Sequence, residues 1–144
     1  MQLTSTLLAL FSTSALAATK STFASTEWTV QSLSRVCDST DVSCKWTFGI
    51  NTNTAGLNAT ACSYTVNATD LAPASQANGA AGICGPYTIT SGWSGQFGAG
   101  QGFTVLSIVD YAKKLIIYAG YTDNMVANGT VVNPDLSFPV QTLP

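Results

Sequence analysis

The chain has 144 residues, of which seven are Asp or Glu, five are Lys or Arg and none is histidine. Five cations cannot form the basic patch that a nucleic-acid partner requires, and the lack of histidine excludes Ser-His-Asp and Cys-His catalytic sites and histidine-bound metal centres. An apolar content of 46% is too high for a disordered chain and sufficient for one buried core.

The N-terminus has the pattern of a secretory signal peptide. A short apolar run, residues 7–11, precedes Ala15-Leu16-Ala17, which matches the small-residue site that signal peptidases cleave. The run is too short and too rich in Ser and Thr to span a membrane. We therefore expect residues 1–17 to be a signal peptide and residues 18–144 to form a single secreted domain that does not span a membrane.

Alternation of apolar and polar residues predicts strands in the first half of the mature chain. The first is expected at residues 27–31, with a weak extension to residue 36, and the second at residues 45–50, where Trp46, Phe48 and Ile50 share one face. A third strand is expected at residues 62–66. A long loop follows at residues 71–82, and loops of this length are uncommon unless they are functional or tied down.

The four cysteines predict two structural disulfides, since an even number in a secreted chain normally pairs. A zinc site is excluded because the chain has neither a Cys-x-x-Cys pair nor a histidine. Of the three possible pairings we favour Cys37–Cys44, which would close the turn of residues 38–43 between the first two strands. Cys62–Cys84 would then anchor both ends of the long loop.

The second half of the chain also predicts strands joined by turns. Strands are expected at residues 87–90, 103–109 and 114–121, with a turn at 110–113. Asn128-Gly129 predicts a hairpin between strands 125–127 and 130–132, and a last strand is expected at 136–143, with Pro139 indicating a sheet edge. No segment has a helical period with caps. The fold class is therefore all-β, a small β-barrel or β-sandwich of eight or nine antiparallel strands.

The segment GWSGQFGAGQGFTVLSIVD, residues 92–110, contains four glycines after its first and raises the question of a phosphate-binding loop. Such a loop places its glycines between a strand and a helix, so that backbone N–H groups face the anion. Here the glycines lead into a strand, and neither Gly-x-Gly-x-x-Gly nor Gly-Lys followed by Ser or Thr is present. We interpret the segment as a corner of the β structure.

The remaining residues give little basis for catalysis. Most of the seven acidic residues fall at expected turns, where Asp normally bonds to its own backbone. Asp38 and Asp41 do not match a calcium-loop pattern. We therefore expect no catalytic residue, no metal and no cofactor. Three Asn-x-Thr sequons make Asn58, Asn67 and Asn128 candidate glycosylation sites.

Several stretches together resemble a known family. These are Arg35-Val36-Cys37, Cys44-Lys45-Trp46-Thr47-Phe48, Gly92-Trp93-Ser94-Gly95-Gln96-Phe97-Gly98, Gly102-Phe103-Thr104, Tyr121-Thr122-Asp123 and Phe138-Pro139-Val140-Gln141. Their layout is similar to that of the hypersensitive-response-inducing elicitors, small secreted proteins of filamentous fungi, and more distantly to the Alternaria major-allergen-like family. The resemblance implies a small β-barrel or sandwich in which Cys62–Cys84 matches a shared disulfide.

The resemblance also implies a function, which is to trigger cell death and immune responses in plants and to aid virulence. The expected partner is a plant cell-surface receptor or an apoplastic protein. The allergen-like relatives have a second disulfide nearer the C-terminus and an extra cysteine that can link a dimer. This chain has no cysteine after Cys84, and its two expected disulfides leave none unpaired. A monomer or a non-covalent dimer is therefore expected. Two alternatives stay open, a small-ligand-binding β-barrel and a structural protein of the fungal surface or wall.

Overall fold

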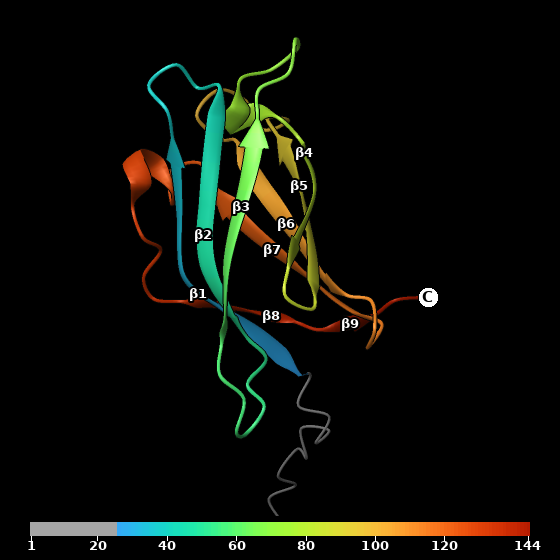
Figure 1. The fold of residues 1–144 in the computed structure, drawn as a ribbon. Helices are drawn as coiled ribbons and strands as arrows, with labels where there is room; N and C mark the ends of the chain where they lie inside the picture. Colours follow the sequence, from blue (N-terminus) through green and yellow to red (C-terminus); the bar gives the residue numbers. More distant parts are fainter. Residues whose placement is uncertain (1–25) are drawn as a thin grey trace, which may run out of the picture.

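The computed structural model describes residues 26–144 as two antiparallel sheets that face each other (Figure 1). One sheet has the strand order β3-β2-β1-β8 and the other the order β4-β5-β6-β7-β9. The strands are β1 (Glu27–Cys37), β2 (Ser43–Asn51), β3 (Thr60–Asn67), β4 (Gly79–Cys84), β5 (Tyr87–Ser94), β6 (Phe103–Asp110), β7 (Leu115–Thr122), β8 (Leu136–Pro139) and β9 (Gln141–Thr142), and two 3-10 turns are η1 (Ala74–Gln76) and η2 (Ala127–Gly129). The all-β prediction is confirmed, and the architecture is a sandwich and not a closed barrel.

The expected signal peptide, residues 1–17, lies outside the described residues.

The space between the sheets is filled by side chains that the strand alternation turns inward. Trp46, Phe48 and Ile50 of β2 lie on one side of this core, and Leu106 and Ile108 of β6 lie on the other. Burial of one such large side chain contributes about 1.5–3 kcal/mol. In the described residues these side chains occupy the space where the alternative of a ligand-binding barrel would place its ligand.

Both long sides of the sandwich are closed. On one side the Cys62–Cys84 disulfide joins β3 to β4, which are the edge strands of the two sheets, and the Tyr64 hydroxyl donates to the Ala80 carbonyl at 2.7 Å. On the other side the chain passes directly from β8 in one sheet to β9 in the other. Among the described residues, no helix has the length and apolarity needed to cross a membrane.

Two expected segments are wrong because tertiary packing determines their structure. The expected loop at 71–82 contains η1 and the beginning of β4. Strand β4 lacks apolar alternation because its glycines lie under the Tyr64 ring, where a Cβ on Gly82 would come within 2.9 Å of the ring. The expected last strand is divided, since the chain leaves β8 at Pro139 and the Val140 N–H donates to the Thr26 carbonyl at the crossing. The edge position of Pro139 is confirmed.

The expected hairpin around Asn128-Gly129 is also wrong. Both residues have the positive φ that the dipeptide predicts, 56° and 71°. Their flanks, however, are not strands. Val126 and Val132 are buried in the core, and the Val132 N–H donates to the Leu33 carbonyl at 2.8 Å, so these flanks pack against β1 instead of pairing with each other.

A bulge in β1 determines which residues of this strand face the core. The register of β1 against β2 shifts between Gln31 and Ser34, and Ser32 has a φ of 48°. One extra residue reverses the alternation. Trp28 and Val30 face inward before the bulge, and after it the inward residues are Leu33 and Arg35, while Val36 is 58% exposed.

Candidate functional site

Four segments meet at one end of the sandwich, which we call the loop end. They are residues 38–43, 68–78, 95–102 and 123–131; the first two lie at the top of Figure 1, and the last, which contains η2, lies at its upper left. Backbone hydrogen bonds join them in two pairs: Ala68 N–H donates to the Val42 carbonyl at 2.8 Å, and Asp123 N–H donates to the Gly102 carbonyl at 2.9 Å. The Arg35 side chain links the two pairs, because its guanidinium contacts both Ser75 and Asp123. The loop end is therefore one continuous surface built from both sheets.

Arg35 lies at the centre of the loop end and connects the two sheets. It is only 9% exposed, and its guanidinium contacts an Asp123 carboxylate oxygen at 3.1 Å. The same nitrogen donates to the Ser75 carbonyl at 3.4 Å, and the guanidinium carbon lies 5.5 Å from the centre of the Trp46 ring. A buried charge is costly unless it is paired, and here the carboxylate, the carbonyl and the indole face all compensate it.

The glycine-rich segment is attached to Arg35 through Asp123. Residues 95–102 connect β5 to β6, so the segment is a loop between two strands, as the sequence predicts. The Trp93 indole N–H donates to the second Asp123 carboxylate oxygen at 2.9 Å. Gly102 lies beneath this pair, because a Cβ there would overlap Asp123 and come within 2.8 Å of the Trp93 ring. One carboxylate thus holds Arg35 and Trp93 together.

The turn of residues 38–43 is closed at its base by the Cys37–Cys44 disulfide. Within it, an Asp38 carboxylate oxygen accepts from the Val42 N–H at 2.7 Å. Asp41 adopts a left-handed backbone conformation, with a φ of 54°, and its carboxylate accepts from both the Ser75 N–H, at 2.8 Å, and the Ser75 hydroxyl. These contacts fix η1 against the disulfide turn.

Asp41 also lies close to the sulfur atoms of Cys37 and Cys44. This arrangement does not make a thiolate metal site, because both sulfurs are bonded to each other and only the thiolate binds metals well. The disulfides are the two pairings expected from the sequence, Cys37–Cys44 and Cys62–Cys84.

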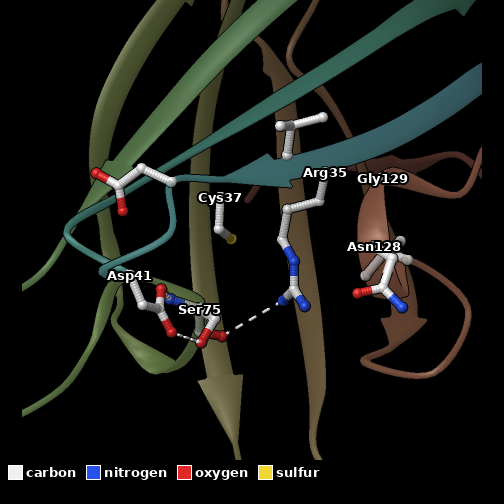
Figure 2. Close-up of a pocket in the computed structure, with 9 residues that line it drawn as sticks. Arg35, Cys37, Asp41, Ser75, Asn128 and Gly129 are labelled. Carbon is white, nitrogen blue, oxygen red and sulfur yellow. Dashed lines mark hydrogen bonds between the residues drawn. The ribbon is translucent and has the colours of Figure 1, made fainter.

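A polar groove of about 580 Å³ opens beside Arg35 (Figure 2). Asp41 and Ser75 lie on one side of the Arg35 side chain and Asn128 lies on the other. The carboxylates of Asp38 and Asp41 are already bonded to neighbouring loop groups. The hydrogen-bonding groups of the groove are therefore held in fixed positions, which suits binding of a partner surface without rearrangement of the loops.

The three candidate glycosylation sites are exposed but are not close together. Asn67 ends β3 and Asn128 lies in η2 beside the groove, both at the loop end. Asn58 lies in the β2–β3 loop at the opposite end, beside residues of the β6–β7 turn. A glycan on Asn128 would cover part of the groove.

Sequence reasoning missed the network around Arg35. Simple alternation along β1 turns Arg35 outward, and only the bulge at Ser32 brings it into the interior. Asp123 looks like an ordinary turn aspartate. One signal was available in the sequence. Cations are rare in this chain, which has five, and Arg35 lies only two residues before Cys37 in an expected strand.

Comparison with known proteins shows which family the chain belongs to. The family model described as Effector TSP1 matches residues 29–143, a range that contains all four cysteines, Arg35 and Asp123. A curated relative, Effector TSP1 of Hypocrea virens (strain Gv29-8 / FGSC 10586), is 51% identical over 118 residues, which are 82% of this chain and 78% of the relative. The chain therefore belongs to the Effector TSP1 family.

Proposed function

We propose that this protein is a secreted fungal effector that triggers plant defence and cell death through its folded surface, without catalysis. Membership of an effector family carries the proposal. The loop end supports it further, because disulfide, ion-pair and hydrogen-bond contacts hold four exposed segments in one arrangement. Such a surface can bind a partner without first ordering its loops.

The partner in this proposal is a plant cell-surface receptor or an apoplastic protein. Its contact region is the loop end, in which residues 38–43 and 68–78 are tied to each other. Secretion follows from the signal-peptide pattern of residues 1–17. Exposure of Asn58, Asn67 and Asn128 makes all three accessible for N-glycans on that route.

Leaf infiltration with purified mature protein, residues 18–144, tests this function. One sample is native, and the other is reduced and alkylated, with loss of the fold checked by circular dichroism. We expect cell death and an oxidative burst from the native form alone, because reduction removes both disulfides that hold the surface. Equal responses to both forms would show that a linear peptide is recognised instead.

Absence of a response to either form across several plant hosts would contradict the elicitor function. Co-sedimentation of the native protein with chitin or glucan would then test the alternative of a wall protein. Binding there combined with an inert leaf response would replace the proposal with that alternative.

A further inference from the structure

We infer that the turn of residues 69–72 is the main contact of this protein with its partner, and that Leu71 inserts into an apolar pocket with a basic rim on a protein. We call this turn, together with Val42 and Pro73, the Leu71 surface. The inference rests on the proposed function, because it specifies where the recognised surface lies and what chemistry the partner has.

The first observation is the exposure of Leu71. This side chain is 98% exposed and belongs to the turn that Thr69 and Ala72 close. The segment between β3 and η1 that contains this turn projects from the loop end (Figure 1). Val42, 55% exposed, lies beside it, and both line a shallow depression of about 380 Å³ with Pro73. An apolar patch on a projecting turn is typical of a contact that becomes buried on binding.

The second observation is that the turn is held rigidly. The Thr69 hydroxyl accepts from the N–H groups of Leu71 and Ala72 at 3.2 and 3.1 Å, and the Thr69 N–H donates to the Ala72 carbonyl at 2.9 Å. At its base, Ala68 and Ala74 donate to the carbonyls of Val42 and Asp41. Leu71 is therefore presented on an ordered backbone, which lowers the entropic cost of binding.

The third observation is the charge around the Leu71 surface. The charged residues that line the same depression as Leu71 are both acidic, Asp41 and Asp70. The loop end as a whole has two more carboxylates, from Asp38 and Asp123, against the cations of Arg35 and Lys45. Arg35 is already paired with Asp123. The two remaining lysines of the described residues, Lys113 and Lys114, lie in the β6–β7 turn at the opposite end. A complementary partner therefore has basic groups around its apolar pocket.

The same charges favour a protein over a lipid surface. Anionic headgroups attract basic segments, whereas Asp70 directly precedes Leu71 and would be repelled by them. A single apolar side chain also gives little membrane affinity.

The test compares Leu71→Asp with Leu57→Asp. Leu57 is a matched control because it is also exposed, at 57%, but lies in the β2–β3 loop at the opposite end. Each variant is infiltrated over a dose series, and each competes with fluorescently labelled wild-type protein for binding to plant suspension cells. Urea unfolding midpoints confirm that both variants fold as the wild type does.

We expect Leu71→Asp to raise the half-maximal dose and the competing concentration about tenfold or more, as for loss of a central contact residue. Leu57→Asp should match the wild type, and Asp70→Lys should weaken competition at low salt. Equal potency of Leu71→Asp and wild type would overturn the inference and leave the effector function standing. If the wild type is inert in leaves but binds cells through Leu71, the inference holds and the elicitor function fails. If the wild type neither elicits nor binds, both fail.

Discussion

Arg35 occupies a position that a half-buried strand normally gives to an apolar residue. Its guanidinium is buried, and the groups that face it come from three places: Asp123 after β7, the Ser75 carbonyl in η1 and the Trp46 ring on β2. Removing one member of a buried pair leaves the other charge uncompensated, which costs more than the pair itself contributes. At the scale of a residue, Arg35 therefore determines how the two sheets meet at the loop end.

Replacing Arg35 by methionine should lower the free energy of unfolding by roughly 1–3 kcal/mol. This decrease is smaller than the one usually caused by breaking a fully buried ion pair, because Asp123 is 29% exposed and water can solvate its carboxylate. Lys45→Met is the control, since Lys45 is an exposed cation on the neighbouring strand. Urea denaturation measures both. A loss for Arg35→Met no larger than that for Lys45→Met would show that the ion pair is not a stabilising contact.

Tyr121 is a second residue whose environment has a measurable consequence. Its hydroxyl is buried and has no hydrogen-bond partner among the described residues. Burial, with a smaller effect from the Asp135 carboxylate, raises the pKa of this phenol far above its ordinary value of about 10. The unfolded chain therefore releases the Tyr121 proton at a lower pH than the folded chain, and stability falls as pH rises above about 10.

Tyr121→Phe should reduce this alkaline loss, by up to about 1.4 kcal/mol per pH unit for one proton. At neutral pH the variant should be as stable as the wild type or more stable, because it removes an unsatisfied buried hydroxyl. Denaturation at pH 7 and at several values above 10 measures both effects. An unchanged slope in the variant would mean that another group is responsible, and the buried Tyr64 and Tyr87, whose pKa values are also raised by burial, are the next to examine.

At the scale of an element, the β5–β6 hairpin shows how glycines can serve packing. Its loop lies between two strands, and Trp93 folds over it to reach Asp123. Phe97 stacks on Phe103 across the same loop, with ring centres 5.8 Å apart. Glycine at position 102 is required by the close approach of Trp93 and Asp123, whereas a Cβ at Gly92 would make only an ordinary contact with the Asn78 side chain.

Gly102→Ala should destabilise the protein by about 1–3 kcal/mol, as expected for inserting a methyl group into a filled site. Gly92→Ala is the matched control in the same hairpin, because the nearest atom to its added Cβ lies at 3.7 Å. Thermal unfolding measures the stability, and the indole fluorescence of the three tryptophans reports the environment of Trp93. Equal effects of the two substitutions would contradict the close packing around Gly102.

A strand could be predicted from the sequence wherever alternating apolar side chains of that strand fill the core and so stabilise it. This holds for β2, in which Trp46, Phe48 and Ile50 fill the core. It fails for β4, whose sequence Gly-Ala-Ala-Gly-Ile-Cys forms a strand because it pairs with β5 and leaves room for Tyr64. Such a strand depends on residues distant in the sequence, which no local pattern contains.

The candidate site could be predicted only in part, for the same physical reason. The disulfide turn at 38–43 follows from cysteine spacing and strand alternation, both of which are local. The contacts of Arg35 with Asp123 and Ser75 depend on a one-residue bulge and on the relative position of the two sheets. Reversal of the alternation at Ser32 is visible only when β1 is aligned with β2.

At the scale of the whole molecule, the two disulfides have different roles. Cys37–Cys44 closes a turn within one sheet, with a separation of 7 residues, whereas Cys62–Cys84 joins the edges of two sheets across a separation of 22 residues. In the chain-entropy model the stabilisation increases with the length of the closed loop. The second bond is therefore the one that holds the sandwich together.

Replacing both Cys62 and Cys84 by alanine should lower the free energy of unfolding by about 3 kcal/mol, and replacing Cys37 and Cys44 by about 2 kcal/mol. Both double variants remove one bond and two sulfurs, so each controls for the other. Urea denaturation gives the comparison. A larger loss for the Cys37 and Cys44 variant would show that bracing of the loop end contributes more than joining the sheets.

Closure of both sides of the sandwich also determines how such a protein is degraded. A protease must draw an extended segment into its active site, and the usual source of one in a β protein is an edge strand that peels away. Here the edge strands β3 and β4 are joined by a disulfide, and the edge strands β8 and β9 are consecutive parts of the chain. Cleavage within the sheets therefore requires global unfolding. We expect the lifetime of this protein in a protease-rich fluid to depend on its unfolding equilibrium or its unfolding rate, and not on local opening of one strand.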